Sequence, residues 1–208
     1  MTAVPQPPPD LDHLVLATPD LEAAVADVAE RCGVTPVRGG SHVDRGTANH
    51  LLGLSPTAYL EIVGPDPAQP EPAQRRPFGI DDLDRTRLVT WAVHPPDPDA
   101  VVAAARAAGA HPGDLAPMSR RTPGGDLLRW RLTPDRGIVP FVIAWGDTPH
   151  PARDLPAVRL RSLVLRHPDP ARIRERLDAL GVTATVEPGP SAAVEVVLDT
   201  PRGDVALG

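Results

Sequence analysis

Two arginines on one predicted strand are the first residues of this sequence that suggest chemistry. In the segment DLLRWRL, side chains alternate so that Arg129 and Arg131 share one face and Trp130 lies on the other. The helix expected after Pro98 is built from Ala and Val, so Trp130 or Trp91 would fill the space beneath it. Arg129 and Arg131 would then face a concave side, where paired guanidinium groups favour a carboxylate, a phosphate or an enolate. The alternative is a solvated edge strand whose arginines bind nothing specific.

Other residue types narrow the chemistry further. Trp145 and Tyr59 could supply an aromatic wall to a binding site, and Arg120 and Arg121, expected in a loop, could add positive charge. The only cysteine, Cys32, lies on the apolar stripe of a predicted helix, so we expect it to be a small buried apolar residue and not a nucleophile. No Ser-His-Asp order and no G-x-S-x-G elbow is visible, so the sequence does not support hydrolase chemistry of that type.

Composition limits the partners. The chain of 208 residues has a net charge of −6, and its basic residues are scattered arginines that form no stripe, which argues against a nucleic-acid partner. The opening MTAVPQPPPD has neither a basic segment nor an apolar core, and no apolar run is long enough to span a membrane. We therefore expect a soluble cytoplasmic protein whose partner is a small molecule.

The elements that must position these residues repeat along the chain. A strand-like segment that ends in Pro-Asp occurs three times, as LVLATPD, WAVHPPD and LVLRHPD, and an amphipathic stretch closed by a glycine follows each copy. The aspartates are Asp20, Asp97 and Asp169, and the glycines are Gly33, Gly109 and Gly181. Each aspartate can cap a helix and each glycine can end one. Short strands follow, so one unit is expected to contain a strand, a helix and about three strands.

This repeated order resembles the vicinal oxygen chelate superfamily, in which paired modules form a cup around a metal or a substrate. The segments LDHLVLATPD and PMSRRTPGGDLLRWRLTPDRGIVPFVIAWGDTPHP are similar to glyoxalase-like bacterial proteins of that superfamily. The resemblance implies an α+β fold of repeated βαβββ modules, two full modules and a shorter third. Because the superfamily contains isomerases, lyases, extradiol dioxygenases and metal-free drug-binding proteins, the fold does not fix the function.

The expected boundaries follow the Pro-rich segments. We expect a disordered lead over residues 1–10, paired modules over 11–146 (11–65 and 87–146, with a linker at 66–86), a second linker at 147–157 and the third module at 158–208.

The resemblance implies metal ligands on the first and last strands of each paired module, which in module one are His13 and Glu61. Imidazole and carboxylate suit a divalent ion such as Zn, Ni, Mn or Fe. The repeat places Thr90 and Ile143 at the corresponding positions of module two, and neither is a good ligand. His42 or His50 of the same module could complete a metal site, or His94 or His150 could enter it from the connections. Alternatively, His13 and Glu61 hydrogen-bond each other or a substrate, with no metal present.

The same resemblance adds one polar residue to the cup. In GTANHLL, strand alternation allows either Asn49 or His50 to face inward, and the GTAN wording favours Asn49.

These residues together predict a glyoxalase-like protein that binds a small anionic organic molecule in a cup between modules one and two. As an enzyme it would be a lyase or isomerase in which Glu61 removes a proton next to a carbonyl and His13 is a ligand or hydrogen-bond partner. The alternative is a metal-free binding or sequestering protein of the resistance type. A third option is that the third module pairs with another chain, for example in a homodimer.

Overall fold

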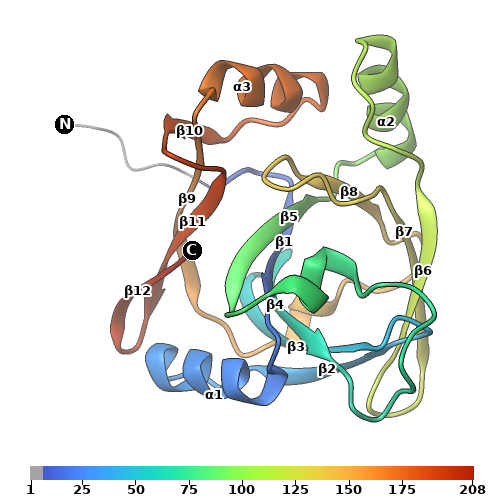
Figure 1. The fold of residues 1–208 in the computed structure, drawn as a ribbon, viewed down its shortest axis with the longest axis vertical. Coiled ribbons are helices and arrows are strands. Elements are labelled where there is room, and N and C mark those ends of the chain that lie inside the picture. Colours follow the sequence, from blue (N-terminus) through green and yellow to red (C-terminus); the bar gives the residue numbers. More distant parts are fainter. Residues whose placement is uncertain (1–6) are drawn as a thin grey trace.

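The structure, a computed structural model, describes residues 7–208. They form a closed eight-stranded barrel and a separate four-stranded sheet that lies beside it (Figure 1). The lead expected over residues 1–10 lies largely outside the described part of the chain. Among residues 7–208, no helix is both long enough and apolar enough to cross a membrane.

The repeated order of one strand, one helix and three strands is confirmed in each of the three units. Unit one contains β1 (Leu11–Ala17), α1 (Leu21–Cys32), β2 (Val37–His42), β3 (Thr47–Ser55) and β4 (Ala58–Pro65). Unit two contains β5 (Arg87–Val93), α2 (Pro98–Ala107), β6 (Ala116–Arg121), β7 (Leu127–Leu132) and β8 (Phe141–Ala144). Unit three contains β9 (Arg159–His167), α3 (Pro170–Ala179), β10 (Thr185–Pro188), β11 (Ala193–Thr200) and β12 (Gly203–Leu207).

The repeated Pro-Asp turns begin the three helices in the same way. The side chains of Asp20, Asp97 and Asp169 each accept a hydrogen bond from a backbone N–H in the first turn of the helix that follows. At the other end of α1, Gly33 adopts a left-handed conformation with φ of 69°, which few residues other than glycine tolerate. The short-range sequence signals therefore fix the helix ends.

Units one and two close one barrel between them. Its strand order is β1-β4-β3-β2-β6-β7-β8-β5, and β5 returns to pair with β1. Within each unit the first strand runs parallel to the last, as β1 does with β4 and β5 with β8. On the far side of the barrel the two units meet where Ser41 and His42 pair with Arg121 and Arg120. A closed barrel of this kind has an interior to which both units contribute side chains.

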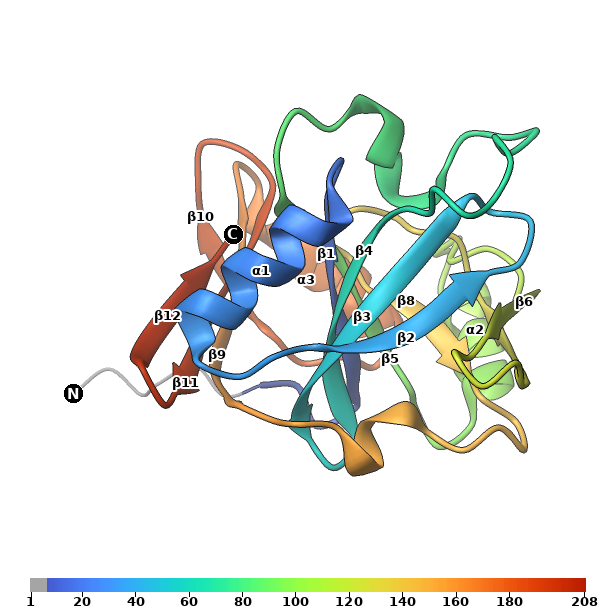
Figure 2. The same ribbon diagram turned by 90° about the horizontal axis from the view of Figure 1, so that it is seen from below.

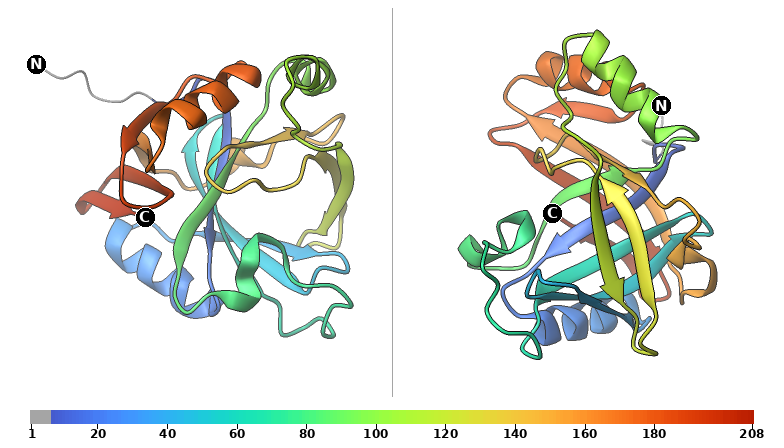
Figure 3. Two further views of the ribbon diagram at one scale, coloured as in Figure 1. Left: turned by 45° about the horizontal axis from the view of Figure 1, so that its top comes forward. Right: turned by 90° about the vertical axis from the view of Figure 1, so that its right-hand side faces the viewer.

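Unit three keeps the order of elements but pairs its strands differently. Its sheet has the order β10-β9-β11-β12, so β9 lies between β10 and β11 and does not touch the last strand. Figure 3 shows this sheet, in orange and red, beside the barrel and not part of it. It therefore covers the barrel wall and does not complete it.

Two separate apolar cores follow from strand alternation. Leu14 and Leu16 of β1 point out of the barrel and pack with the three helices and the inner face of the sheet of unit three. Val15 and Ala17 point into the barrel and belong to a second cluster. Figure 2 shows α1 between the barrel strands and β12, where it closes the outer core. Since the apolar face of unit three is buried within its own chain, that face is not available to a partner.

The predicted inward orientation of Arg129 and Arg131 is wrong. Trp91, which is fully buried and whose Nε1 donates to the carbonyl of Ile138 at 2.8 Å, belongs to the cluster that includes the inner side of α2. Trp130 is therefore not needed there, and it lies in the cluster inside the barrel. The neighbouring arginines consequently point away from the interior and are exposed. The predicted alternation of side chains along β7 is correct, but the face assigned to the interior depended on which tryptophan, Trp91 or Trp130, packs beneath α2.

Candidate functional site

A cavity of about 360 Å³ lies inside the barrel. Its size is at the lower end of the range for small-molecule sites, about 300–1,000 Å³. The polar side chains that line it come from both units and include His13, His42, Asn49, Glu61 and Arg120. Apolar and aromatic side chains form most of the remaining wall. The cavity therefore has the mixed lining that small organic ligands need.

Glu61 is a buried carboxylate with one oxygen held and one free. Its side chain points inward from β4, and its Oε1 accepts a hydrogen bond of 2.6 Å from Nδ2 of Asn49. The other oxygen, Oε2, lies 3.9 Å from Nε2 of His13, beyond hydrogen-bond distance. Antiparallel pairing sets Leu51 of β3 opposite Glu61, and Asn49, two residues earlier on the same face, reaches the carboxylate. Oε2 is thus the oxygen that can accept a proton.

His13 is oriented by a buried aspartate that the sequence analysis missed. Nδ1 of His13 lies 2.5 Å from Oδ1 of Asp12, and the ring stacks on Tyr59 with centroids 4.8 Å apart. The other oxygen of Asp12 accepts a hydrogen bond from Nε1 of Trp145 at 2.8 Å and lies 3.1 Å from Nε2 of His150. Burial raises the pKa of Asp12, but the hydrogen bonds from His13 and His150 outweigh it and hold that pKa well below its ordinary value.

This ionised aspartate fixes the tautomer of His13. Because Asp12 is an acceptor only, Nδ1 of His13 carries the proton, and Nε2 is the nitrogen that faces Glu61. The pairing of β1 with β5 shifts register between Leu11 and His13, and this irregularity allows Asp12 to lie on the same side as its neighbour. Plain alternation places the two residues on opposite faces, so no sequence signal identified Asp12.

His42 is a neutral neighbour of the carboxylate. Its Nδ1 lies 3.0 Å from Oγ1 of Thr47, and its Nε2 lies 3.5 Å from Oε1 of Glu61. Burial lowers the pKa of His42 more than the charge of Glu61 raises it. His42 therefore supports Glu61 without adding a positive charge.

Arg120 is the buried one of two cations that line the cavity, and Arg45 is the half-buried one. Arg120 was expected in a loop, but it lies on β6, is buried, and donates from Nη1 to Oδ1 of Asn49 at 3.0 Å. Glu61 has the ring nitrogens of His13 and His42 as neighbours, at 3.9 and 3.5 Å, and within residues 7–208 no carboxylate forms an ion pair with Arg120. Burial lowers the pKa of Arg120, while Tyr59 and Glu61 raise it. The guanidinium still keeps its charge, because arginine is not deprotonated in proteins.

The close approach of Arg120 requires a glycine on the neighbouring strand. A Cβ atom on Gly39 would lie 2.0 Å from Nη1 of Arg120 and 2.4 Å from Oδ1 of Asn49. We expect Gly39→Ala to displace both side chains and to lower the free energy of unfolding by about 1–3 kcal/mol, as overpacking does. Urea denaturation measures this. In the matched control Gly124→Ala, the added Cβ meets no atom closer than 3.7 Å, so equal losses in both variants would contradict the explanation.

The arrangement does not fit the divalent ion that the resemblance implied. Within residues 7–208, no three His, Cys, Asp or Glu side chains are arranged to hold a metal. Oε1 of Glu61 faces the amide nitrogen of Asn49, which cannot ligate, and the guanidinium of Arg120 lies just beyond that amide. In unit two, Thr90 and Ile143 offer no ligand in place of His13 and Glu61. A fixed cation next to the carboxylate disfavours a second one.

The linker between the first two units forms part of the cavity wall. It was expected only to connect the two modules, but Ile80 is buried and Phe78, in the 3₁₀ segment Pro77–Asp82, lines the cavity. Phe78 has a φ of 60°, which is uncommon and costly for an aromatic residue. Arg76 fixes the segment to the rest of the barrel, because its Nε donates to the carbonyl of Gly46 at 3.1 Å. No motif in the sequence predicted this strained backbone conformation at Phe78.

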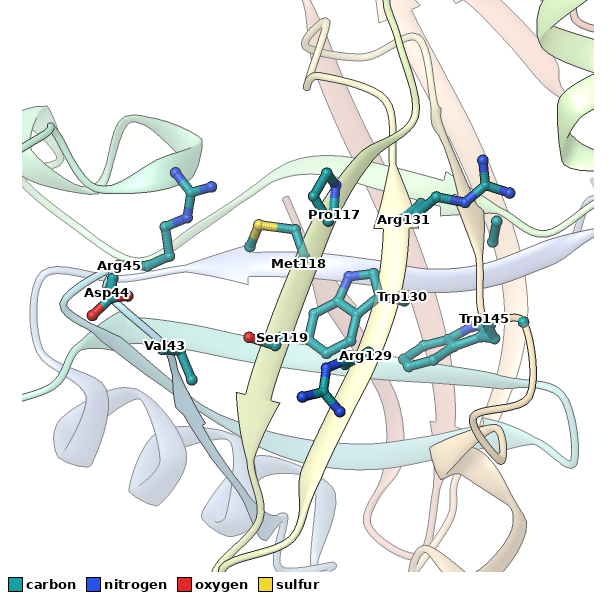
Figure 4. A pocket seen from close by; sticks show the side chains of 12 residues that line it. Val43, Asp44, Arg45, Pro117, Met118, Ser119, Arg129, Trp130, Arg131 and Trp145 are labelled. Atoms are coloured by element: carbon teal, nitrogen blue, oxygen red, sulfur yellow. The ribbon is translucent and has the colours of Figure 1, made fainter.

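The structure brings most of the expected site residues together and leaves two outside. Those that line the cavity are His13, His42, Asn49, Tyr59, Glu61 and Trp145. Alternation allowed either Asn49 or His50 to face inward, and the cavity is lined by Asn49, the residue that the GTAN motif favoured, and not by His50. Arg129 and Arg131 line a separate and more open depression of about 460 Å³, in which their side chains point apart (Figure 4). Arg131 is also paired with Asp99 at 2.8 Å, so its charge is already balanced.

The comparisons with known proteins agree with this architecture. The family described as a glyoxalase-like domain matches residues 11–181. A solved structure of a hypothetical protein from Staphylococcus aureus has a TM-score of 0.70 and 13% identity, over 95% of this chain and 98% of that one. A mutant of 4-hydroxymandelate synthase from Streptomyces coelicolor has a TM-score of 0.53 and 16% identity, over 97% of this chain and 63% of that one. No curated protein matches the chain. Such identities show a shared fold only.

Proposed function

The chain belongs to the glyoxalase-like domain family of the vicinal oxygen chelate superfamily, and we propose that it binds a small anionic organic molecule in the barrel cavity and removes a proton next to a carbonyl. The observation that carries this proposal is Glu61, a buried carboxylate with one oxygen held by Asn49 and the other free toward the cavity. A general base needs this combination of fixed orientation and an open acceptor atom.

The proposed step is a proton transfer to Glu61. The C–H bond next to the carbonyl breaks, its proton goes to Oε2, and its electron pair moves to the carbonyl oxygen to give an enolate. Arg120, a buried cation one amide group away from Glu61, stabilises the negative charge that develops. Return of the proton from Glu61, or from Nε2 of His13 when that nitrogen is protonated, completes an isomerisation. Loss of a leaving group from the enolate gives a lyase reaction instead.

Proton exchange tests the proposal without knowledge of the natural substrate. The protein is incubated in D₂O with a panel of 2-oxo and 3-oxo carboxylic acids, and proton NMR follows the loss of the signal next to the carbonyl. We expect at least one acid to exchange faster than it does without protein. If none exchanges faster, the proposed enzyme activity is wrong.

Chelation separates this mechanism from one that depends on a metal. Since Asn49 and Arg120 occupy the surroundings of Glu61, we expect the exchange rate to be unchanged after dialysis against EDTA. The control is the same protein dialysed without chelator. A rate that falls with EDTA and returns with Zn, Ni, Mn or Fe would contradict the assignment of Arg120 as the stabilising charge.

The binding or sequestering alternative predicts a different pair of results. It uses the same cavity but needs no proton acceptor, so ligand binding without any exchange over the panel would favour it. The open oxygen Oε2 does not decide between the two, because it can accept a hydrogen bond from a ligand as well as a proton, so the exchange experiment makes the distinction.

A further inference from the structure

Arg120 is a buried charge with no opposite charge bound to it. Its side chain lines the cavity inside the barrel. Within residues 7–208, its one side-chain hydrogen bond is to the neutral Asn49. A buried ion normally has a partner of opposite charge, because removal from water is costly. A guanidinium presents several N–H groups in a plane and matches a carboxylate with two parallel hydrogen bonds. The missing partner of Arg120 is therefore a group that the ligand supplies.

The aromatic residues of this chain gather around the same cavity. The sequence contains two Phe, three Trp and one Tyr. All except Trp91 line the cavity, namely Tyr59, Phe78, Trp130, Phe141 and Trp145. The rings of Trp130 and Trp145 lie 5.3 Å apart, and those of Phe78 and Phe141 lie 6.2 Å apart. Elsewhere the core is built mainly from aliphatic side chains. Faces and edges of aromatic rings prefer a flat aromatic partner.

Asn49 sets the distance between the charge and the base. Its Oδ1 accepts from Arg120 and its Nδ2 donates to Glu61, so a single carboxamide group separates the two. A carboxylate on the cavity side of Arg120 therefore brings its neighbouring carbon atoms toward Oε2 of Glu61. The reacting C–H group and the anchoring carboxylate thus belong to adjacent parts of one small molecule.

We propose that the ligand is an aromatic carboxylic acid, whose carboxylate pairs with Arg120 and whose ring packs among the aromatic side chains of the cavity. This assignment rests on the proposed function in placing the ligand beside Glu61. It goes further by naming the substrate class and the residue that selects it. The exposed arginines of β7 have no part in this recognition.

The test compares the binding of four probes, which differ in whether they carry a negative charge and an aromatic ring. Calorimetry or tryptophan fluorescence measures the binding. Phenylacetate has both the ring and the charge, phenylacetamide lacks the charge, acetate lacks the ring, and ethanol lacks both. We expect wild-type protein to bind phenylacetate most tightly. The comparison of phenylacetate with phenylacetamide needs no variant, so it stands even where replacement of a buried arginine prevents folding. If the amide binds as tightly as the acid, or acetate as tightly as phenylacetate, the proposal is wrong.

Two substitutions on one strand locate the charge. Arg120→Gln is expected to weaken phenylacetate binding by about 30-fold or more, and to leave phenylacetamide binding unchanged. Arg121→Gln, next on β6 and exposed, is the matched control and is expected to change neither. Equal effects of the two substitutions on phenylacetate would overturn the assignment of Arg120.

The binding test of the ligand class can fail or succeed independently of the exchange test of the catalytic step. If phenylacetate binds through Arg120 while no acid exchanges its proton, the ligand class stands and the catalytic step fails. If exchange occurs but does not depend on Arg120, Glu61 stands as the base, while the ligand class fails and Arg120 is not the stabilising charge.

Discussion

Replacement of Glu61 by Gln is expected to slow the catalysed proton exchange by about 10²–10⁴-fold, the usual contribution of a general base. Glutamine has the same shape and its amide can still contact Asn49, but it cannot take a proton from carbon. The measurement is the rate of deuterium incorporation into the acid that wild-type protein exchanges best. Because Arg120 is unchanged in this variant, phenylacetate is expected to bind it as it binds wild-type protein.

The matched control is Glu22→Gln, which removes an exposed carboxylate from the first turn of α1. It is expected to exchange at the wild-type rate. If Glu61→Gln also exchanges at that rate, another group is the base. If the variant loses phenylacetate binding as well, its slow exchange reports a damaged cavity and not a missing base.

Replacement of Asp12 by Ala is expected to lower the free energy of unfolding by about 3–5 kcal/mol, the usual cost of breaking a buried pair. Asp12 is fully buried and accepts from His13 and Trp145, so alanine leaves the polar N–H groups of both without an acceptor. Urea denaturation at neutral pH measures the change. The control Asp126→Ala removes an exposed carboxylate and is expected to change stability by less than about 0.5 kcal/mol.

The effect of Asp12 is also expected to depend on pH in a defined direction. Burial raises its pKa, but the hydrogen bonds from His13 and His150 lower it by more, so the folded-state pKa lies below the ordinary value of 3.8. For such a group the stabilisation is fully present above the unfolded-state pKa and is lost as the pH falls through the folded-state pKa. The difference between wild-type protein and Asp12→Ala should therefore shrink as the pH falls below 3.8. A difference that stays constant into that range would show that the charge is not involved.

Long-range repetition made the fold predictable from the sequence. The three Pro-Asp turns and their closing glycines mark the helices, because the signals that begin and end a helix lie within short segments. His13, Asn49 and Glu61 were indicated by the resemblance to the superfamily and not by alternation alone, and the three residues line one cavity.

The remaining site residues depend on contacts that no single element reveals. Which face of β7 points inward depends on whether Trp91 or Trp130 packs beneath α2. The composition of α2 does not distinguish the two tryptophans. Asp12 enters the interior through an irregular pairing with β5, and Phe78 through a strained backbone conformation in a linker. Arg120 reaches Asn49 only because the barrel closes between β2 and β6. Tertiary structure, and not local pattern, decides these four positions.

The position of a bound aromatic carboxylate decides whether one cavity inside the barrel holds both the anchor, Arg120, and the base, Glu61. A crystal structure of the protein soaked with phenylacetate would show it. We expect the carboxylate against Arg120, the ring among the aromatic side chains, and the methylene carbon facing Oε2 of Glu61. Phenylacetate bound instead in the open depression beside Arg129 and Arg131, with the barrel cavity empty, would contradict it.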